Sequence, residues 1–177
     1  MDASEFIKIW TAIGVEHLHA DSSNMGLFDF GSAALDFLFI TGMPSEFQEL
    51  NFDDLKQKKL KTVNQKYSLE NPDYDNYLAI GFNGSGDPIA IRLDNQELVY
   101  LNHDKYFEEV FINSDLKKFA MSVLRIRDFE TEFSDEQFDV LIRDLKSIDS
   151  KIFEQENSHW IFLINYYKWE KNKKSST

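Results

Sequence analysis

Residues 77–104 read YLAIGFNGSGDPIAIRLDNQELVYLNHD, and three apolar runs in this stretch alternate with two polar turns. That spacing is typical of β-hairpins and predicts an antiparallel meander. In the first run, residues 77–82, both alternating sets of side chains are apolar or small, so we expect a central strand that is covered on both faces. The Asn-Gly-Ser-Gly turn at residues 83–86 contains two glycines, which tolerate the positive φ angles of a tight connection.

The neighbouring runs extend the predicted sheet. Apolar residues occupy every second position from Ile89 to Leu93, and Arg92 lies on the opposite side. This alternation predicts a strand with one buried face and one exposed face. Residues 98–101 and 109–112 offer two further strands, so we expect a sheet of about four to six strands that needs a cover on its apolar face.

Five segments carry apolar side chains at helical spacing and can provide that cover. The clearest of them begins after Ser134, which fits a capping box with Gln137. The last segment is apolar on nearly all sides, so it should pack deep in the fold or against a second copy in a homodimer. The sequence therefore predicts an α+β fold in which N- and C-terminal helices cover an antiparallel sheet. The predicted helices lie at residues 4–13, 32–39, 114–123, 134–148 and 160–169.

The chain has the size and composition of one domain. Its 177 residues are 42% hydrophobic and include 16 Phe, which suffices for one core. We expect a single domain over residues 1–170 and a frayed basic tail over residues 171–177. The sequence has no apolar run near eighteen residues, no signal-peptide layout and no Cys. These features predict a cytoplasmic protein without a membrane segment, disulfides or thiolate chemistry.

Acidic residues dominate the charge. The chain has 31 Asp and Glu against 19 Lys and Arg, which gives a net charge of −12. Two lysine-rich stretches, residues 56–66 and 168–174, hold nine of the bases, and the first is more typical of a solvated loop than of a phosphate site. An acidic surface repels nucleic acid and anionic lipid, and it accelerates association with a basic protein. We therefore expect a basic protein partner, and neither nucleic acid nor membrane as a ligand.

Two groups of acidic residues are candidate contacts for such a partner. The first group flanks the last predicted strand, and the second lies around the start of the helix that follows Ser134. The alternative is that these acids are a solvated loop and favourable charges at a helix N-terminus. The groups are Asp104, Glu108, Glu109 and Asp115, and Asp128, Glu130, Glu132, Asp135 and Glu136.

The residue pattern does not indicate a catalytic or metal site. His17 and His19 would share a face of an extended strand, but neither remaining histidine has a visible reason to join them as a ligand. Residues 21–32 have the length of a calcium loop, yet Met25 and Ser32 stand where ligands are needed. We therefore predict a protein that is not an enzyme and that binds no metal or cofactor.

Several short motifs occur in a fixed order along the chain. They are Trp10 in the first helix, the helix end Gly42-Met43-Pro44, the strand-turn-strand at residues 80–89 with Gly81, Gly86, Asp87 and Pro88, the strand end at 100–104, and residues 110–114 leading into Phe119. This ordered set resembles the SUKH superfamily, and the resemblance covers residues 30–125 well. Two features depart from the commonest members: no Asn-Gly-Gly follows Pro44, and a Phe-rich loop separates the first two helices.

The resemblance implies an α+β fold and a protein-binding function. Many bacterial members are cytoplasmic immunity proteins that neutralise a toxin, often a nuclease with a basic surface. In such a complex the acidic groups would cover the active site of the toxin, and aromatic residues would anchor the interface. The yeast cell-wall assembly regulator, another member, suggests an alternative: an intracellular regulator or scaffold that binds endogenous proteins. A third class is a small-ligand module, which an apolar pocket with convergent titratable groups would favour.

Overall fold

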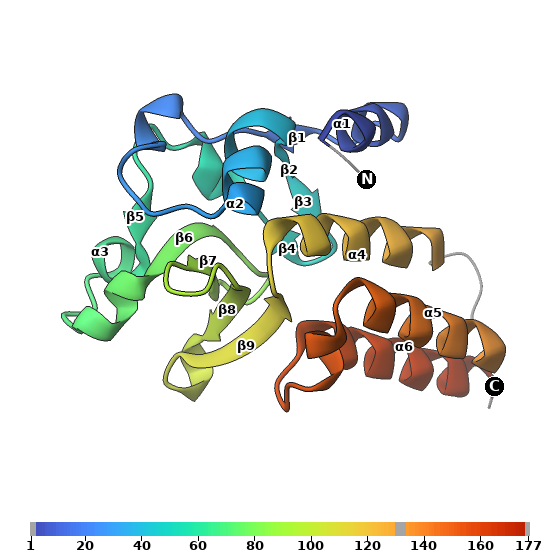
Figure 1. Ribbon diagram of the computed structural model, residues 1–177. Coiled ribbons are helices and arrows are strands. Elements are labelled where there is room, and N and C mark those ends of the chain that lie inside the picture. Colours follow the sequence, from blue (N-terminus) through green and yellow to red (C-terminus); the bar gives the residue numbers. More distant parts are fainter. Residues whose placement is uncertain (1–2, 130–133, 176–177) are drawn as a thin grey trace.

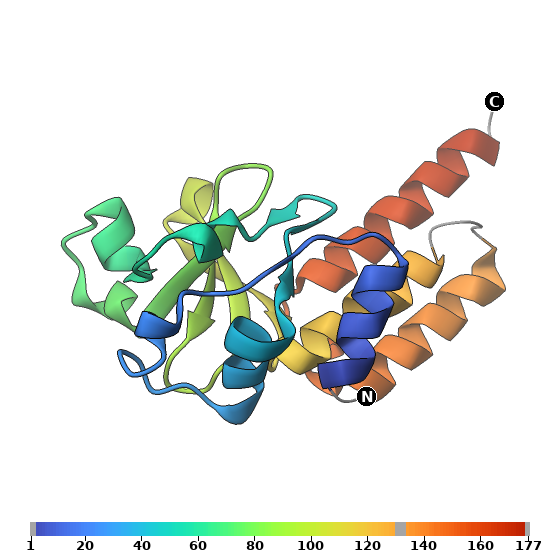
Figure 2. The same ribbon diagram turned by 90° about the horizontal axis from the view of Figure 1, so that it is seen from above.

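A computed structural model of the protein describes residues 3–129 and 134–175. The chain has an α+β fold, as the sequence predicts, with a curled antiparallel sheet and helices on its flanks (Figure 1). In the view from above, the helices that follow the sheet in sequence extend away from it at one end (Figure 2). Every helix among the described residues is too short or too polar to cross a lipid bilayer.

The predicted meander forms the centre of the sheet. The described residues form one sheet of seven strands: β3 (Glu46–Phe47), β4 (Leu50–Asn51), β5 (Lys61–Thr62), β6 (Tyr77–Phe82), β7 (Pro88–Arg92), β8 (Leu98–Asn102) and β9 (Glu108–Asn113). Strands β6 to β9 pair in sequence order. The other edge of β6 pairs with two strands: β5 lies along the first half of β6, and β4 pairs with the last residue of β6. The predicted strand β6 is therefore central, as expected.

Both faces of the sheet are buried along β7. Ile89 and Ile91 face the main core, whereas Ala90 between them belongs to a second, smaller core. Helix α3 (Val63–Tyr67) contributes both of its end residues to this second core. The prediction that this strand has one exposed face was wrong, because a short helix that the sequence pattern did not reveal covers Ala90.

The N-terminal helices lie where the sequence predicts them. Helix α1 (Ala3–Ala12) buries Trp10 completely. Helix α2 (Ser32–Asp36) continues into a π-helical turn, Phe37–Thr41. This turn ends at Gly42, whose φ of +83° lies in the left-handed region that favours glycine.

The three C-terminal helices are α4 (Leu116–Phe129), α5 (Asp135–Ile148) and α6 (His159–Ser175). The predicted capping box is confirmed: the Ser134 hydroxyl accepts a hydrogen bond from the Gln137 N–H, and the Gln137 side chain accepts one from the Ser134 N–H. Helix α6 continues past the predicted domain boundary at residue 170, which therefore falls inside a helix.

A buried polar cluster joins the sheet to these helices. Asn113, at the end of β9, accepts a hydrogen bond from Trp160 Nε1 of α6 (2.8 Å). Its amide nitrogen donates to Ser122 Oγ of α4 and to Asp149 Oδ2 (both 3.2 Å). Asp149, which follows α5, also accepts from the N–H and the hydroxyl of Ser114 (2.7 and 2.8 Å). Because buried polar groups are costly unless they are paired, this cluster fixes where the three helices meet the sheet.

Gly81 allows the β3–β4 hairpin to lie directly against β6. A Cβ atom at this position would stand only 2.0 Å from the backbone oxygen of Asn51 in β4. The turn of the same hairpin consists of Gln48 and Glu49. The missing side chain at Gly81 therefore sets the position of these two residues relative to the sheet.

We expect Gly81→Ala to lower the free energy of unfolding by about 3 kcal/mol, because the β4 backbone must move away from the added Cβ. Gly26→Ala is the matched control, since a Cβ there meets no atom within 4 Å. Chemical denaturation of both variants at pH 7 measures the difference. Equal free energies of unfolding for the two variants would contradict the close approach at Gly81.

Candidate functional site

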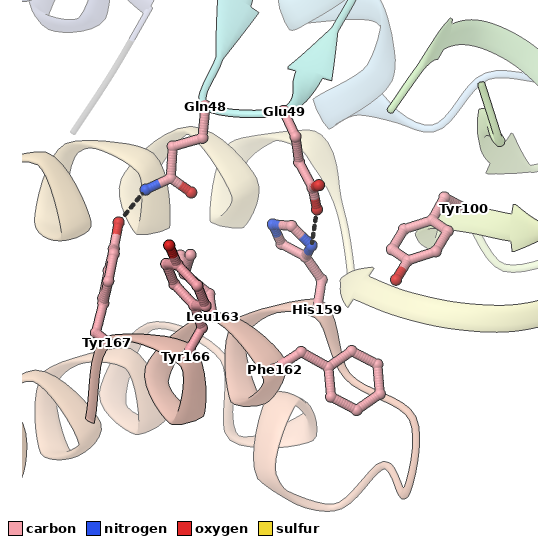
Figure 3. A pocket seen from close by; sticks show the side chains of 8 residues that line it. All are labelled: Gln48, Glu49, Tyr100, His159, Phe162, Leu163, Tyr166 and Tyr167. Carbon is pink, nitrogen blue, oxygen red and sulfur yellow. Dashed lines mark hydrogen bonds and ion pairs between the residues drawn. The ribbon is translucent and has the colours of Figure 1, made fainter. Parts of the chain in front are cut away.

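A pocket of about 470 Å³ opens between the β3–β4 turn, strand β8 and helix α6 (Figure 3). Its side chains come from three segments that are far apart in the sequence. The volume lies within the range of small-ligand sites in proteins. The pocket is lined by Gln48, Glu49, Tyr100, His159, Phe162, Leu163, Tyr166 and Tyr167.

The β3–β4 turn forms one wall of the pocket. Gln48 has a φ of +53°, in the left-handed region that is uncommon for residues other than glycine. Its side-chain amide donates a hydrogen bond to the hydroxyl of Tyr167 in α6, as Figure 3 shows. This bond ties the turn to the helix across one side of the pocket.

His159 forms the inner wall. It is the first residue of α6 and only 3% exposed. The start of α6 is held by β9, because the Phe111 N–H donates to the Asn157 carbonyl (3.0 Å) and Phe111 forms a bridge with Ser158. The imidazole Nδ1 lies 3.9 Å from Glu49 Oε1, whereas Nε2 has no hydrogen-bond partner among the described residues. Burial lowers the pKa of His159 to about 4, so the imidazole is neutral at pH 7.

Carboxylates supply the charge in and near the pocket. Burial and then the charge of Asp87 raise the pKa of Glu49. Burial, followed by the charges of Glu49 and Asp87, raises the pKa of Tyr100 to about 12. The lining residues include neither Lys nor Arg. Within the described part of the chain, the basic side chain within 4 Å of the Glu49 carboxylate is that of His159. Because this imidazole is neutral at pH 7, it does not balance the charge of Glu49.

A second carboxylate, that of Asp87, lies near Glu49. Asp87 is buried and accepts hydrogen bonds from Asn83 Nδ2 and from the His103 N–H (both 2.8 Å). Its Oδ1 also lies 2.5 Å from His103 Nδ1. His103 directly follows β8, which confirms its predicted place at a strand end. Gly86 has a φ of +85°, which glycine adopts without strain, and this allows the turn before β7 to close. Of the motif residues, Gly86 thus shapes the turn and Asp87 accepts the hydrogen bonds that hold it.

Exposed aromatic side chains continue from the pocket along α6. Phe162, Tyr166 and Trp169 recur at helical spacing and are 44%, 50% and 57% exposed. Trp160 and Ile164, on the other side of the helix, are buried. Helix α6 thus packs deep on one face only. Contiguous exposed aromatic residues are typical of protein interaction sites.

The structure separates the members of the first predicted acidic group. Asp104 and Glu108 lie at the end of the sheet where β8 stops and β9 begins. Glu109 accepts a hydrogen bond from the Tyr77 hydroxyl (2.9 Å) and lies 3.4 Å from Arg92. Its charge is therefore partly neutralised within the fold, whereas that of Asp104 is exposed.

Asp115, the remaining member of the first group, lies apart from the second group, because α4 separates them along the chain. Asp115 precedes α4 and accepts a hydrogen bond from the Lys118 N–H (2.8 Å), so it acts as a helix cap. Asp135 and Glu136 begin α5, where Asp135 lies 2.6 Å from Lys171 of α6. The structure thus does not gather the two groups into one acidic face. Glu130, Glu132 and the side chain of Asp128 lie outside the described residues.

The two N-terminal histidines do lie together. Strand β1 (His17–Leu18) pairs with β2 (Met43–Pro44), and the rings of His17 and His19 are 5.5 Å apart, centroid to centroid. His19 Nε2 lies 3.1 Å from the carbonyl oxygen of Ile40. Across residues 3–129 and 134–175, no three His, Asp or Glu side chains form a group that could hold a metal ion.

Sequence reasoning missed the pocket. Glu49 lies between strands of two residues each, which are too short to show an alternating pattern. His159 was considered only as a metal ligand, and Tyr100 only as a strand residue. The available signal was α6 itself, because a helix that is apolar on nearly all sides leaves aromatic residues exposed when only one face packs.

Comparisons of the chain with protein-family models, curated proteins and solved structures gave no match. The resemblance to the SUKH superfamily therefore stays a prediction from the motif residues. The site and those motif residues together are the observations that bear on function.

The low pKa of His159 predicts that the protein loses stability in acid. As the pH falls below 6.5, the unfolded chain binds a proton at His159 before the folded protein does. The contribution of the neutral imidazole is complete above pH 6.5 and is lost progressively toward pH 4, and it amounts to about 3 kcal/mol. The raised pKa of Glu49, which faces the ring, acts in the opposite direction.

Denaturant unfolding of the wild type and of His159→Gln between pH 7 and pH 4 measures this loss as a difference. Glutamine does not titrate, and the other titrating groups are common to both proteins. We expect the wild type to lose more stability than the variant over this range. Parallel pH profiles would contradict a buried neutral imidazole at His159.

Proposed function

We propose that this protein is an immunity protein that binds a basic bacterial toxin and blocks its active site. The observation that carries this proposal is the row of exposed aromatic residues, Phe162, Tyr166 and Trp169, on the helix that lines the pocket. Among the described residues, the carboxylate in this pocket has no Lys or Arg next to it. The ordered motifs that resemble the SUKH superfamily and the net charge of −12 support the same function.

The roles of the two surface features differ. Aromatic side chains contribute large contact areas with little loss of conformational entropy, so Phe162 and Tyr166 are suited to anchor an interface. The dispersed carboxylates, including Asp104 and Glu136, attract a basic partner over long range and raise the rate of association. A stable complex needs about 800 Å² of buried surface on each partner, which the pocket, the aromatic row and their surroundings can provide together.

A growth assay tests the proposed function. Co-expression with a candidate toxin encoded beside this chain should restore growth of a bacterial host that the toxin inhibits. The double variant Phe162→Ala/Tyr166→Ala should lose this protection, because removing two anchors weakens the complex by about 3 kcal/mol. Leu27→Ala, which shortens an apolar side chain that is also exposed, should protect like the wild type. Absence of protection by the wild-type protein would refute the immunity function.

Association kinetics test the role of the carboxylates. We expect Asp104→Lys/Glu136→Lys to slow association with the toxin by about tenfold at low salt, and the difference to vanish near 1 M salt, where the Debye length is about 3 Å. Surface plasmon resonance at several salt concentrations measures both rates. The control Glu70→Lys reverses an exposed charge that follows α3 and should have a smaller effect. An association rate that is indifferent to the double exchange at all salt concentrations would contradict electrostatic steering by these residues.

A second candidate function is the binding of a small cationic ligand. The specific observation that favours it is the convergence of Glu49, Tyr100 and His159 on one pocket of ligand size. Mass spectrometry of small molecules released from the purified protein by heat distinguishes the two candidates. A stoichiometric cationic compound would favour the small-ligand module over the immunity protein.

A further inference from the structure

We propose that the pocket receives an arginine side chain of the protein partner, with the guanidinium group held between the Glu49 carboxylate and His159 Nε2. This inference rests on the proposed function, because it names the part of a basic partner that this surface recognises. It is carried by three features of the pocket: its hydrogen-bonding groups, its charge and its aromatic walls.

Two groups of the pocket lining, the Glu49 carboxylate and the neutral imidazole of His159, can accept hydrogen bonds. A neutral imidazole that directs its Nδ1–H toward Glu49 presents Nε2 as an acceptor. This nitrogen is buried and has no partner among the described residues, and in Figure 3 it points toward the side where Gln48 and Tyr166 lie. A buried acceptor without a donor lowers the stability of the folded protein. A ligand that donates several hydrogen bonds would satisfy both His159 and Glu49.

The charge of the pocket requires that the donor be a cation. Burial and then the charges of Glu49 and Asp87 raise the pKa of Tyr100. His159 cannot compensate this charge at pH 7, because it is neutral there. Anionic ligands such as phosphate would be repelled by the same field. A cation in the pocket would supply the counter-charge that the lining residues lack.

The shape and the aromatic walls favour guanidinium over ammonium. Tyr166, Phe162 and Tyr167 also line the pocket, and a planar guanidinium stacks on such rings. Its five N–H donors form a fork that can reach two acceptors at once. The Glu49 carboxylate lies 3.9 Å from Nδ1 of His159, and the acceptor nitrogen Nε2 belongs to the same ring, so both acceptors line one pocket. A lysine ammonium is a compact point charge and would satisfy this pair less well.

Binding of a capped amino acid tests the inference without the toxin. Nα-acetyl-arginine N-methylamide is titrated into the protein at pH 7, and the ¹⁵N shifts of the His159 imidazole and the aromatic resonances of the pocket are followed by NMR. We expect a saturable change at His159 Nε2. The equivalent capped citrulline, which is neutral and of similar shape, should bind at least about tenfold more weakly, and capped lysine should lie between them.

Two isosteric variants separate the pocket from the general surface charge. Glu49→Gln should weaken binding of capped arginine by about tenfold. Glu46→Gln removes the same charge from the same hairpin, and Glu46 does not line the pocket, so binding should remain unchanged. Equal affinities of arginine and citrulline, or equal effects of the two variants, would overturn the inference. Free arginine that binds about a hundredfold more tightly than capped arginine would also overturn it, because the occupant would then be a metabolite.

The growth assay, combined with the binding of capped arginine, distinguishes failure of the arginine pocket from failure of the immunity function. If Glu49→Gln weakens binding of capped arginine and also reduces protection against the toxin, both stand. If capped arginine fails to bind while Phe162→Ala/Tyr166→Ala still abolishes protection, the arginine pocket is refuted and the immunity function is retained. If capped arginine binds as expected while the wild type gives no protection, the guanidinium assignment is supported and the immunity function fails.

Discussion

The geometry of the candidate site depends on the buried cluster of Asn113, Asp149 and Trp160. These side chains carry the polar contacts between the end of β9 and the three C-terminal helices. Trp160 is adjacent to His159, so the bond that fixes its indole also fixes the imidazole at the inner wall of the pocket. A purely apolar contact would permit small rotations of α6. Hydrogen bonds with defined donors and acceptors specify one orientation.

Sequence reasoning succeeded where the signal is local. The alternation from Tyr77 onward and the capping box at Ser134 depend on neighbours within a few residues, so the meander and helix α5 could be predicted. It failed where contacts between distant parts of the chain decide whether a residue is buried or lines a pocket. Ala90 is buried because α3 covers it, and a helix of five residues shows no periodicity. Glu49 becomes a pocket residue only because the hairpin that carries it lies against β6 at Gly81.

The charge pattern predicts a basic partner and does not predict where that partner would bind. The predicted acids lie at different ends of β9 and α4, and Glu109 and Asp135 have basic neighbours within the fold. Dispersed charges of this kind raise the rate of encounter and carry little affinity each. The carboxylate of Glu49 differs because the described residue beside it is a neutral histidine and the pocket lining contains neither Lys nor Arg.

Other segments of the chain already bind part of the backbone of β6 and β9, and this restricts how a partner can dock. On one side, β4 and β5 each occupy part of the backbone of β6. On the other side, the Phe111 N–H of β9 is already bound to the Asn157 carbonyl. A visiting β-strand would first have to displace these segments, so recognition by strand augmentation is disfavoured, as is edge-to-edge aggregation. The protein partner that we propose would then be recognised through side chains, and these can change while the hydrogen-bonded framework stays intact.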